Sequence, residues 1–221
     1  KEKPYHFYHV TRSEIDLPEN VDVHSQAVYD KAKENLDRLI NDKILVQDNE
    51  PCYYIYELVM DGRSQTGLVC GSSCDDYFNG VIKKHEFTRP EKELDRINHI
   101  RTTRAQTGVV FLAYNDQEDV QQIIAEWKEG HAPAYDFVAE DGIRHIFWVV
   151  DDYAKVSAIT KLFEEKVPAT YIADGHHRVA SAAKVCQEMR DQGLSITGEE
   201  AFNSFITCIF PASQLAILDY N

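Results

Sequence analysis

A dense cluster of polar residues lies within the segment Tyr171-Ile172-Ala173-Asp174-Gly175-His176-His177-Arg178-Val179-Ala180-Ser181-Ala182. The apolar residues up to Ala173 predict a short buried strand, and Gly175 predicts a turn. The small residues after Arg178 predict a helix whose first turn carries two histidines and an arginine. We therefore expect a strand, a turn and a helix in direct succession.

Residues 175–178 have the properties of an anion-binding site. Backbone N–H groups at a helix start have no partner within the helix and carry roughly half a positive charge. Glycine lets a ligand approach that backbone closely, and arginine presents a planar fork that matches two phosphate oxygens. The segment therefore predicts a phosphate site formed by Gly175, His176, His177 and Arg178.

Two other interpretations of this segment stay open. In the first, Asp174 caps the helix while the cationic side chains pair with surface carboxylates. In the second, Asp174, His176 and His177 bind a metal ion, although side chains adjacent on a helix diverge by about 100°.

A second polar cluster, Lys83-Lys84-His85-Glu86-Phe87-Thr88-Arg89-Pro90, precedes a predicted helix. Thr88 and Glu91 have the spacing of a capping box, and proline is favoured in a first helical turn. Glu86 would lie on the loop, where a carboxylate can accept a proton from a substrate hydroxyl. Arg89 stands where a zinc-protease H-E-x-x-H motif needs histidine. The alternative interpretation is a solvated charge cluster that caps the helix.

Further out, strands and helices alternate along the chain. Asp-Gly at 61–62 and at 141–142 predicts hairpins, because glycine accepts the positive φ of a type I′ turn. Ser25 is a predicted N-cap, and Leu94, Ile97 and Ile100 predict a half-buried helix face. The remaining predicted helices cover residues 26–40, 116–127, 151–163 and 179–190, and the predicted strands cover 52–60, 65–71, 108–114, 135–139, 144–150, 169–173, 203–210 and 215–218. This pattern predicts an α+β (mixed α/β) fold with a mixed sheet, hairpins and flanking helices.

The amino-acid composition argues against several classes of partner and of cellular location. Of the 221 residues, 23 are Lys or Arg and 37 are Asp or Glu, which gives a net charge of -14. Such a surface repels nucleic acids and anionic membranes, so we expect neither as a partner. No apolar run approaches the roughly 20 residues of a membrane helix. Five scattered cysteines favour a reducing cytoplasm over a disulfide framework.

The chain has no Walker A motif and no G-x-G-x-x-G motif. Its first residues are neither a signal peptide nor an initiating Met. We expect residues 1–221 to form a single α/β domain, or a fragment of a longer protein truncated at both ends, with a subdivision near 105–110.

The two polar clusters resemble the bacterial and archaeal domain-of-unknown-function family 1015. The resemblance rests on Ile82-x-x-His85-Glu86-x-Thr88 with Lys92, Asp95 and Arg96, on Asp174-Gly175-His176-His177-Arg178, on Tyr53-Tyr54-Ile55-Tyr56 and on Gly108-Val109-Val110-Phe111. That family is similar to the ParB/sulfiredoxin superfamily, in which a box at a helix start holds nucleotide phosphates. The superfamily includes sulfiredoxin, CTP-binding partition proteins and free-serine kinases.

The resemblance implies site roles. Gly175, His176, His177 and Arg178 would hold nucleotide phosphates, Asp174 would assist a metal or the substrate, and Glu86 beside His85 would correspond to the base of the kinases. It implies ATP or ADP, with CTP as the alternative, and Mg²⁺. His176 stands where sulfiredoxins carry cysteine, which argues against reductase chemistry.

The leading expectation is a nucleotide-binding phosphotransferase acting on a small hydroxyl metabolite, with serine as the first acceptor. Phosphoryl transfer depends mainly on positioning and charge neutralisation, which this set of groups can provide. A non-catalytic regulatory protein that binds a nucleotide or phosphometabolite is the first alternative, and a phosphoester hydrolase is the second. A homodimer is left open.

Overall fold

In the computed structural model, which describes residues 3–216, the Asp61-Gly62 turn joins the first two strands. β1 (Tyr53–Met60) pairs antiparallel with β2 (Arg63–Ser73), and Met60 lies opposite Arg63. Asp61 has φ 52° and Gly62 has φ 78°, the positive values that a type I′ turn requires. The predicted hairpin is confirmed.

The chain is divided into two units. One comprises residues 1–49, 87–108 and 177–203 and is called the helical unit; the other comprises residues 50–86, 109–176 and 204–221 and is called the sheet unit.

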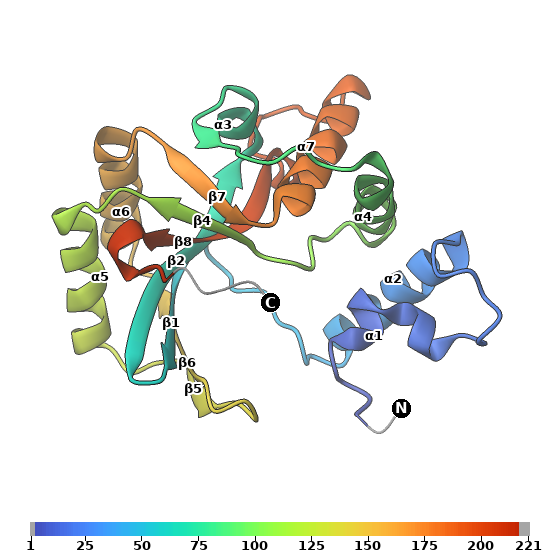
Figure 1. Ribbon diagram of the computed structural model, residues 1–221, viewed down its shortest axis with the longest axis horizontal. Helices are drawn as coiled ribbons and strands as arrows, with labels where there is room; N and C mark the ends of the chain where they lie inside the picture. Colours follow the sequence, from blue (N-terminus) through green and yellow to red (C-terminus); the bar gives the residue numbers. More distant parts are fainter. Residues whose placement is uncertain (1–2, 217–221) are drawn as a thin grey trace. The chain divides into compact units, whose positions relative to one another are not determined.

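The sheet unit contains one eight-stranded mixed sheet (Figure 1). The strand order is β3-β7-β4-β8-β2-β1-β6-β5. β3 pairs parallel with β7 and β4 pairs parallel with β8, whereas the other pairs are antiparallel. The bounds of the remaining strands are β3 Ile82–Lys83, β4 Val110–Tyr114, β5 Tyr135–Val138, β6 Arg144–Val150, β7 Thr170–Asp174 and β8 Ser204–Pro211. The predicted α+β fold class is confirmed.

The α-helices that lie wholly in the described part of the sheet unit are α3 (Cys74–Phe78), α5 (Glu118–Gly130) and α6 (Tyr153–Lys166). α5 and α6 lie side by side, and Lys166 of α6 pairs with Asp119 of α5 (Figure 1). The Trp127 indole donates to the Val149 carbonyl at 3.1 Å, and the Tyr53 and Thr160 hydroxyls lie 2.6 Å apart. These bonds tie both helices to the sheet, whose core includes Ile55, Leu112, Ile172 and Phe205.

The helical unit contains α1 (Tyr8–Thr11), α2 (Gln26–Asn41), α4 (Pro90–Thr103) and all of α7 (His176–Asp191) except its first residue. Tyr29 of α2 donates to the Asp95 carboxylate of α4 at 2.8 Å. Arg101 of α4 makes a two-pronged pair with Glu188 of α7. Short 3-10 turns at Ser13–Asp16 and Ala201–Asn203 complete the unit, and Ala212–Gln214 forms another in the sheet unit.

Several local predictions differ from the structure. The capping-box prediction was wrong, because Arg89 is the N-cap of α4, no side chain caps that helix, and Thr88 instead hydrogen-bonds the Glu93 carboxylate. Ser25 precedes α2 as predicted, yet its hydroxyl makes no capping bond. Leu94 is 55% exposed, because α4 turns Glu93 and Ile97 inward instead.

The observed bounds of one helix and one strand also differ from the predicted bounds. α7 begins at His176, so both histidines and Arg178 lie in its first turn as predicted, three residues before the apolar periodicity that starts at residue 179. Of the strand predicted at 215–218, residues 215 and 216 lie outside any strand, and residues 217 and 218 lie outside the described residues.

Candidate functional site

Parallel pairing of β3 with β7 brings the two polar clusters together. Ile82 lies opposite Thr170 and Lys83 lies opposite Tyr171. Because the two strands run in the same direction, the segments that follow them leave the sheet at the same edge. His85 and Glu86 therefore meet His176, some 90 residues later in the sequence.

The strand, turn and helix that carry His176 form for local reasons. Ile172 is 1% exposed and anchors β7 in the sheet. Gly175 follows with φ 100°, a conformation that residues with a Cβ rarely adopt. The helix then begins at His176, and Val179, Ala182 and Ala183 are buried on it. The prediction of a buried strand was wrong for most of β7, because only Ile172 of its five residues is buried. His176 is held where a long helix begins after this strand.

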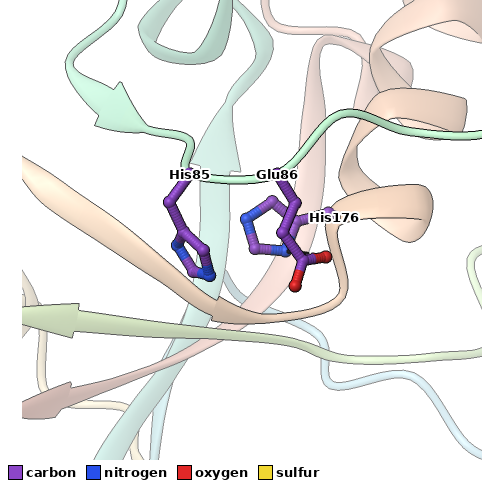
Figure 2. A group of neighbouring side chains, drawn as sticks. All are labelled: His85, Glu86 and His176. Carbon is purple, nitrogen blue, oxygen red and sulfur yellow. Dashed lines mark ion pairs between the residues drawn. The ribbon is translucent and has the colours of Figure 1, made fainter.

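The three side chains form a compact cluster (Figure 2). One ligand atom of each, a ring nitrogen or a carboxylate oxygen, lies within 4.8 Å of those of the others. His176 Nδ1 is 3.6 Å from Glu86 Oε2, and the two imidazole rings pack edge to face with centroids 4.4 Å apart. The His176 side chain is 5% exposed and that of Glu86 is 60% exposed. A carboxylate open to solvent beside a buried imidazole can accept a proton, and the three groups together can bind a cation.

Two of the predicted phosphate ligands, His177 and Arg178, lie in the helical unit. His177 Nε2 accepts a hydrogen bond from the Arg89 backbone N–H at 3.1 Å. Arg178 is half-buried and lies close to Gly108, where an added Cβ would stand 3.0 Å from its Cδ. The phosphate-binding roles of both residues stay predictions.

Asp174 ends β7 opposite Phe111 of β4, beside an irregularity in the strand register, and its side chain is exposed. In the described part of the chain, the group of potential metal ligands around His176 does not include Asp174. Its assignment to a metal ion stays a prediction.

The basic residues around Glu86 have contacts of their own. Lys84 Nζ lies 4.0 Å from the ring centroid of Tyr77, a cation–π contact within the sheet unit. Lys83 is exposed in β3. Lys83 and Lys84 are both exposed, and the two interpretations of this segment stay predictions.

A cavity of about 550 Å³ in the sheet unit was not expected from the sequence. Burial raises the pKa of the Cys70 thiol at its wall, so that thiol is not an activated nucleophile. Burial, together with neighbouring Asp75, also raises the pKa of Asp76. No short motif could have indicated this cavity, because its walls come from distant segments: Tyr53, Leu68, Cys70, Gly71, Ser72, Ser73, Asp76, Val81, Ile82, Thr160, Phe163, Glu164, Val167, Pro168, Thr170 and Ile209.

The five cysteines, all within residues 3–216, are in the thiol form. Among the described helices, none combines the length and apolar character needed to span a bilayer.

Comparison with known proteins identifies one family. A family model described as "Protein of unknown function (DUF1015)" matches residues 1–221. No curated protein matches the chain, and no solved structure matches it.

Proposed function

We propose that this chain, which belongs to the DUF1015 family, is a nucleotide-dependent phosphotransferase acting on the hydroxyl group of a small metabolite, with serine as the first acceptor to test. One observation carries the proposal. The Glu86 carboxylate lies 3.6 Å from His176, the first residue of α7, although the sequence separates them widely. An exposed carboxylate beside the first residue of a helix supports the role of a base, because we propose the anion site at that helix start.

The phosphate site of the proposal is the start of α7. Gly175 turns the chain, and the first-turn amides of a 16-residue helix favour a polyanion. The side chains of His176, His177 and Arg178 would add donors. Mg²⁺ would neutralise phosphate charge, and the exposed carboxylate of Asp174 is the oxygen donor that this ion prefers.

The proposed reaction is one displacement at phosphorus. The acceptor oxygen forms a bond to the terminal phosphorus of the nucleotide, and the bond from that phosphorus to the bridging oxygen breaks. The hydroxyl proton passes to the Glu86 carboxylate, and the shortened nucleotide leaves with the bridging oxygen. His85 and His176 orient the carboxylate.

The proposal also includes the type of core, the cellular compartment and the partners of the protein. A core of the ParB/sulfiredoxin type is supported by the strand, glycine turn and helix at residues 170–191. Five thiols support a reducing cytoplasm. The net charge of -14 supports small-molecule partners, with neither nucleic acid nor membrane among them.

Two measurements test the proposal. ATP, ADP or CTP with Mg²⁺ should raise the melting temperature, because a ligand that binds the folded state stabilises it. Phosphorus NMR with serine should then detect a phosphomonoester. No shift with any of the three nucleotides would overturn the proposal, whereas inorganic phosphate as the product would favour a hydrolase.

Glu86→Gln separates an enzyme from a regulatory protein. We expect turnover to fall about 10²- to 10⁴-fold, the usual contribution of a positioned base, while nucleotide affinity stays within about twofold. Glu91→Gln removes an exposed carboxylate five residues further on and is the matched control. Nucleotide binding without turnover in the wild-type protein would identify a sensor.

A further inference from the structure

His85, Glu86 and His176 have the donor set of a metal site. All three belong to the sheet unit, and their ligand atoms lie within 4.8 Å of one another. His85 and Glu86 come from the loop after β3, and His176 is the first residue of α7, two positions after β7 ends. Because β3 and β7 pair directly, the segments that follow these two strands are held close to each other whether or not a ligand is bound.

The spacing within the cluster suits a shared ion better than a direct hydrogen bond. His176 Nδ1 and Glu86 Oε2 are 3.6 Å apart, which is longer than the roughly 2.7–3.2 Å of a hydrogen bond. Donors bound at about 2.0–2.1 Å to one tetrahedral ion lie roughly 3.3 Å from each other. The observed pair needs to close by only a few tenths of an ångström.

The cluster combines one fixed ligand with two that can adjust. His176 is 5% exposed and begins a long helix, so its ring position is set by packing. His85 and Glu86 are exposed on their loop, and the edge-to-face contact of the two rings already holds His85 beside His176. Small rotations of the two loop side chains can therefore complete a site, and one side of it stays open to solvent.

The donor types select the kind of ion. Imidazole nitrogens suit zinc and its first-row neighbours, whereas Mg²⁺ and Ca²⁺ prefer sites built from oxygen. Three protein ligands leave a coordination position for water or for a substrate hydroxyl.

The geometry points to one divalent transition-metal ion, with Zn²⁺ as its probe, bound by His85, Glu86 and His176. The inference stands without the proposed function, because it concerns the protein before any nucleotide binds. The two are also compatible: Glu86 can bind the ion through one carboxylate oxygen and keep the other as a proton acceptor.

Calorimetric titration of Zn²⁺ into the chelator-treated full chain, with no nucleotide present, tests the inference. We expect one tight site per chain, a rise in melting temperature on loading, and much weaker binding of Mg²⁺. Co²⁺ in the same site should show the visible absorption of a low-symmetry complex. Absence of a Zn²⁺ site, or equal binding of Mg²⁺ and Zn²⁺, overturns the inference.

Two ligand variants locate the site. His85→Ala and Glu86→Gln should each lower the Zn²⁺ affinity by about 100-fold or more, since even the loss of an outer-shell partner costs about 10- to 100-fold. Both side chains are exposed, so the variants should keep the far-ultraviolet circular dichroism of the wild type.

The matched control is His24→Ala. His24 is also an exposed histidine beside a carboxylate, with its Nδ1 2.9 Å from Asp95, and it has no role in the cluster. This variant should bind Zn²⁺ as the wild type does. Unchanged affinity in His85→Ala or Glu86→Gln would overturn the assignment. Zn²⁺ binding without phosphoryl transfer would overturn only the proposed function.

Discussion

Glu93 shows how one residue of the helical unit acquires a pKa that differs from that of a free carboxylate. Its side chain is 4% exposed, and it accepts hydrogen bonds from Lys184 and Thr88. Burial by itself would raise the pKa of Glu93, but these two donors outweigh it and hold the pKa below the ordinary value of 4.5. The folded protein therefore binds this proton more weakly than the unfolded chain does.

Glu93→Gln should lower the free energy of unfolding by about 1–3 kcal/mol near neutral pH, the usual range for a hydrogen bond to a charged group. The expected loss in the free energy of unfolding is modest because Lys184 is 56% exposed and can be hydrated once its partner is lost. Since the folded-state pKa lies below the unfolded one, the contribution is complete above pH 4.5 and disappears as the pH falls through the folded-state pKa. Urea unfolding of both proteins from pH 7 to pH 3 measures the difference.

The control for this change is Asp37→Asn, which removes the exposed pair that Asp37 makes with Lys33 at 2.6 Å. An exposed pair contributes little, so stability should change by less than about 0.5 kcal/mol. A Glu93→Gln deficit of the same size at pH 7 and pH 3 would contradict the assigned ion pair.

At the scale of the element, Gly67 of β2 leaves room for two side chains of β8. A Cβ at this position would stand 2.7 Å from Cys208 Sγ and 2.8 Å from Phe210 Cζ. Phe210 is 4% exposed and packs edge to face against Phe111, with ring centroids 4.8 Å apart. The side chains opposite Gly67 therefore have little room to move.

Gly67→Ala should consequently lower the free energy of unfolding by about 1–3 kcal/mol, the usual cost of adding a methyl group to a packed core. Gly130→Ala is the control, because Gly130 ends α5 and has no neighbouring heavy atom within 4 Å of an added Cβ. The control should be neutral or slightly stabilising. Equal effects of the two substitutions in denaturant unfolding would contradict the packing argument.

At the scale of the whole molecule, the two units are interleaved along the chain. The chain passes from one unit to the other after residues 49, 86, 108, 176 and 203. The sheet is interleaved as well. β1, β2 and β3 come from the first half of the chain, whereas β4 to β8 come from the second half. In the sheet, β2 and β1 lie between β8 and β6.

The fragment 109–221 should therefore not fold by itself, even though one passage between units falls between Gly108 and Val109. It retains β7-β4-β8 and β6-β5 but lacks the two strands that join these groups. Without the two joining strands, β8 and β6 would each present an unpaired edge. We expect no cooperative thermal transition by circular dichroism, with the 221-residue chain as the control. A cooperative transition of the fragment would show that the subdivision expected near 105–110 marks an independent domain.

The sequence by itself determined the local features of this protein. The Asp61-Gly62 hairpin and the Gly175 turn follow from the backbone preferences of one or two residues, and most helices and strands follow from apolar periodicity. These effects act over a few residues, so the amino-acid sequence is enough to predict them. The two polar segments, each centred on an unusual run of charged and histidine residues, could be recognised for the same reason.

Only the tertiary structure decided which of those residues meet. The pairing of β3 with β7 placed His85 and Glu86 beside His176, and the packing of α4 buried Glu93 while it exposed Leu94. Such contacts depend on the balance of burial and chain entropy over the whole molecule, and no local preference encodes that balance. For the same reason, no sequence motif predicts the cavity, whose walls include residues of β1, β2 and α6.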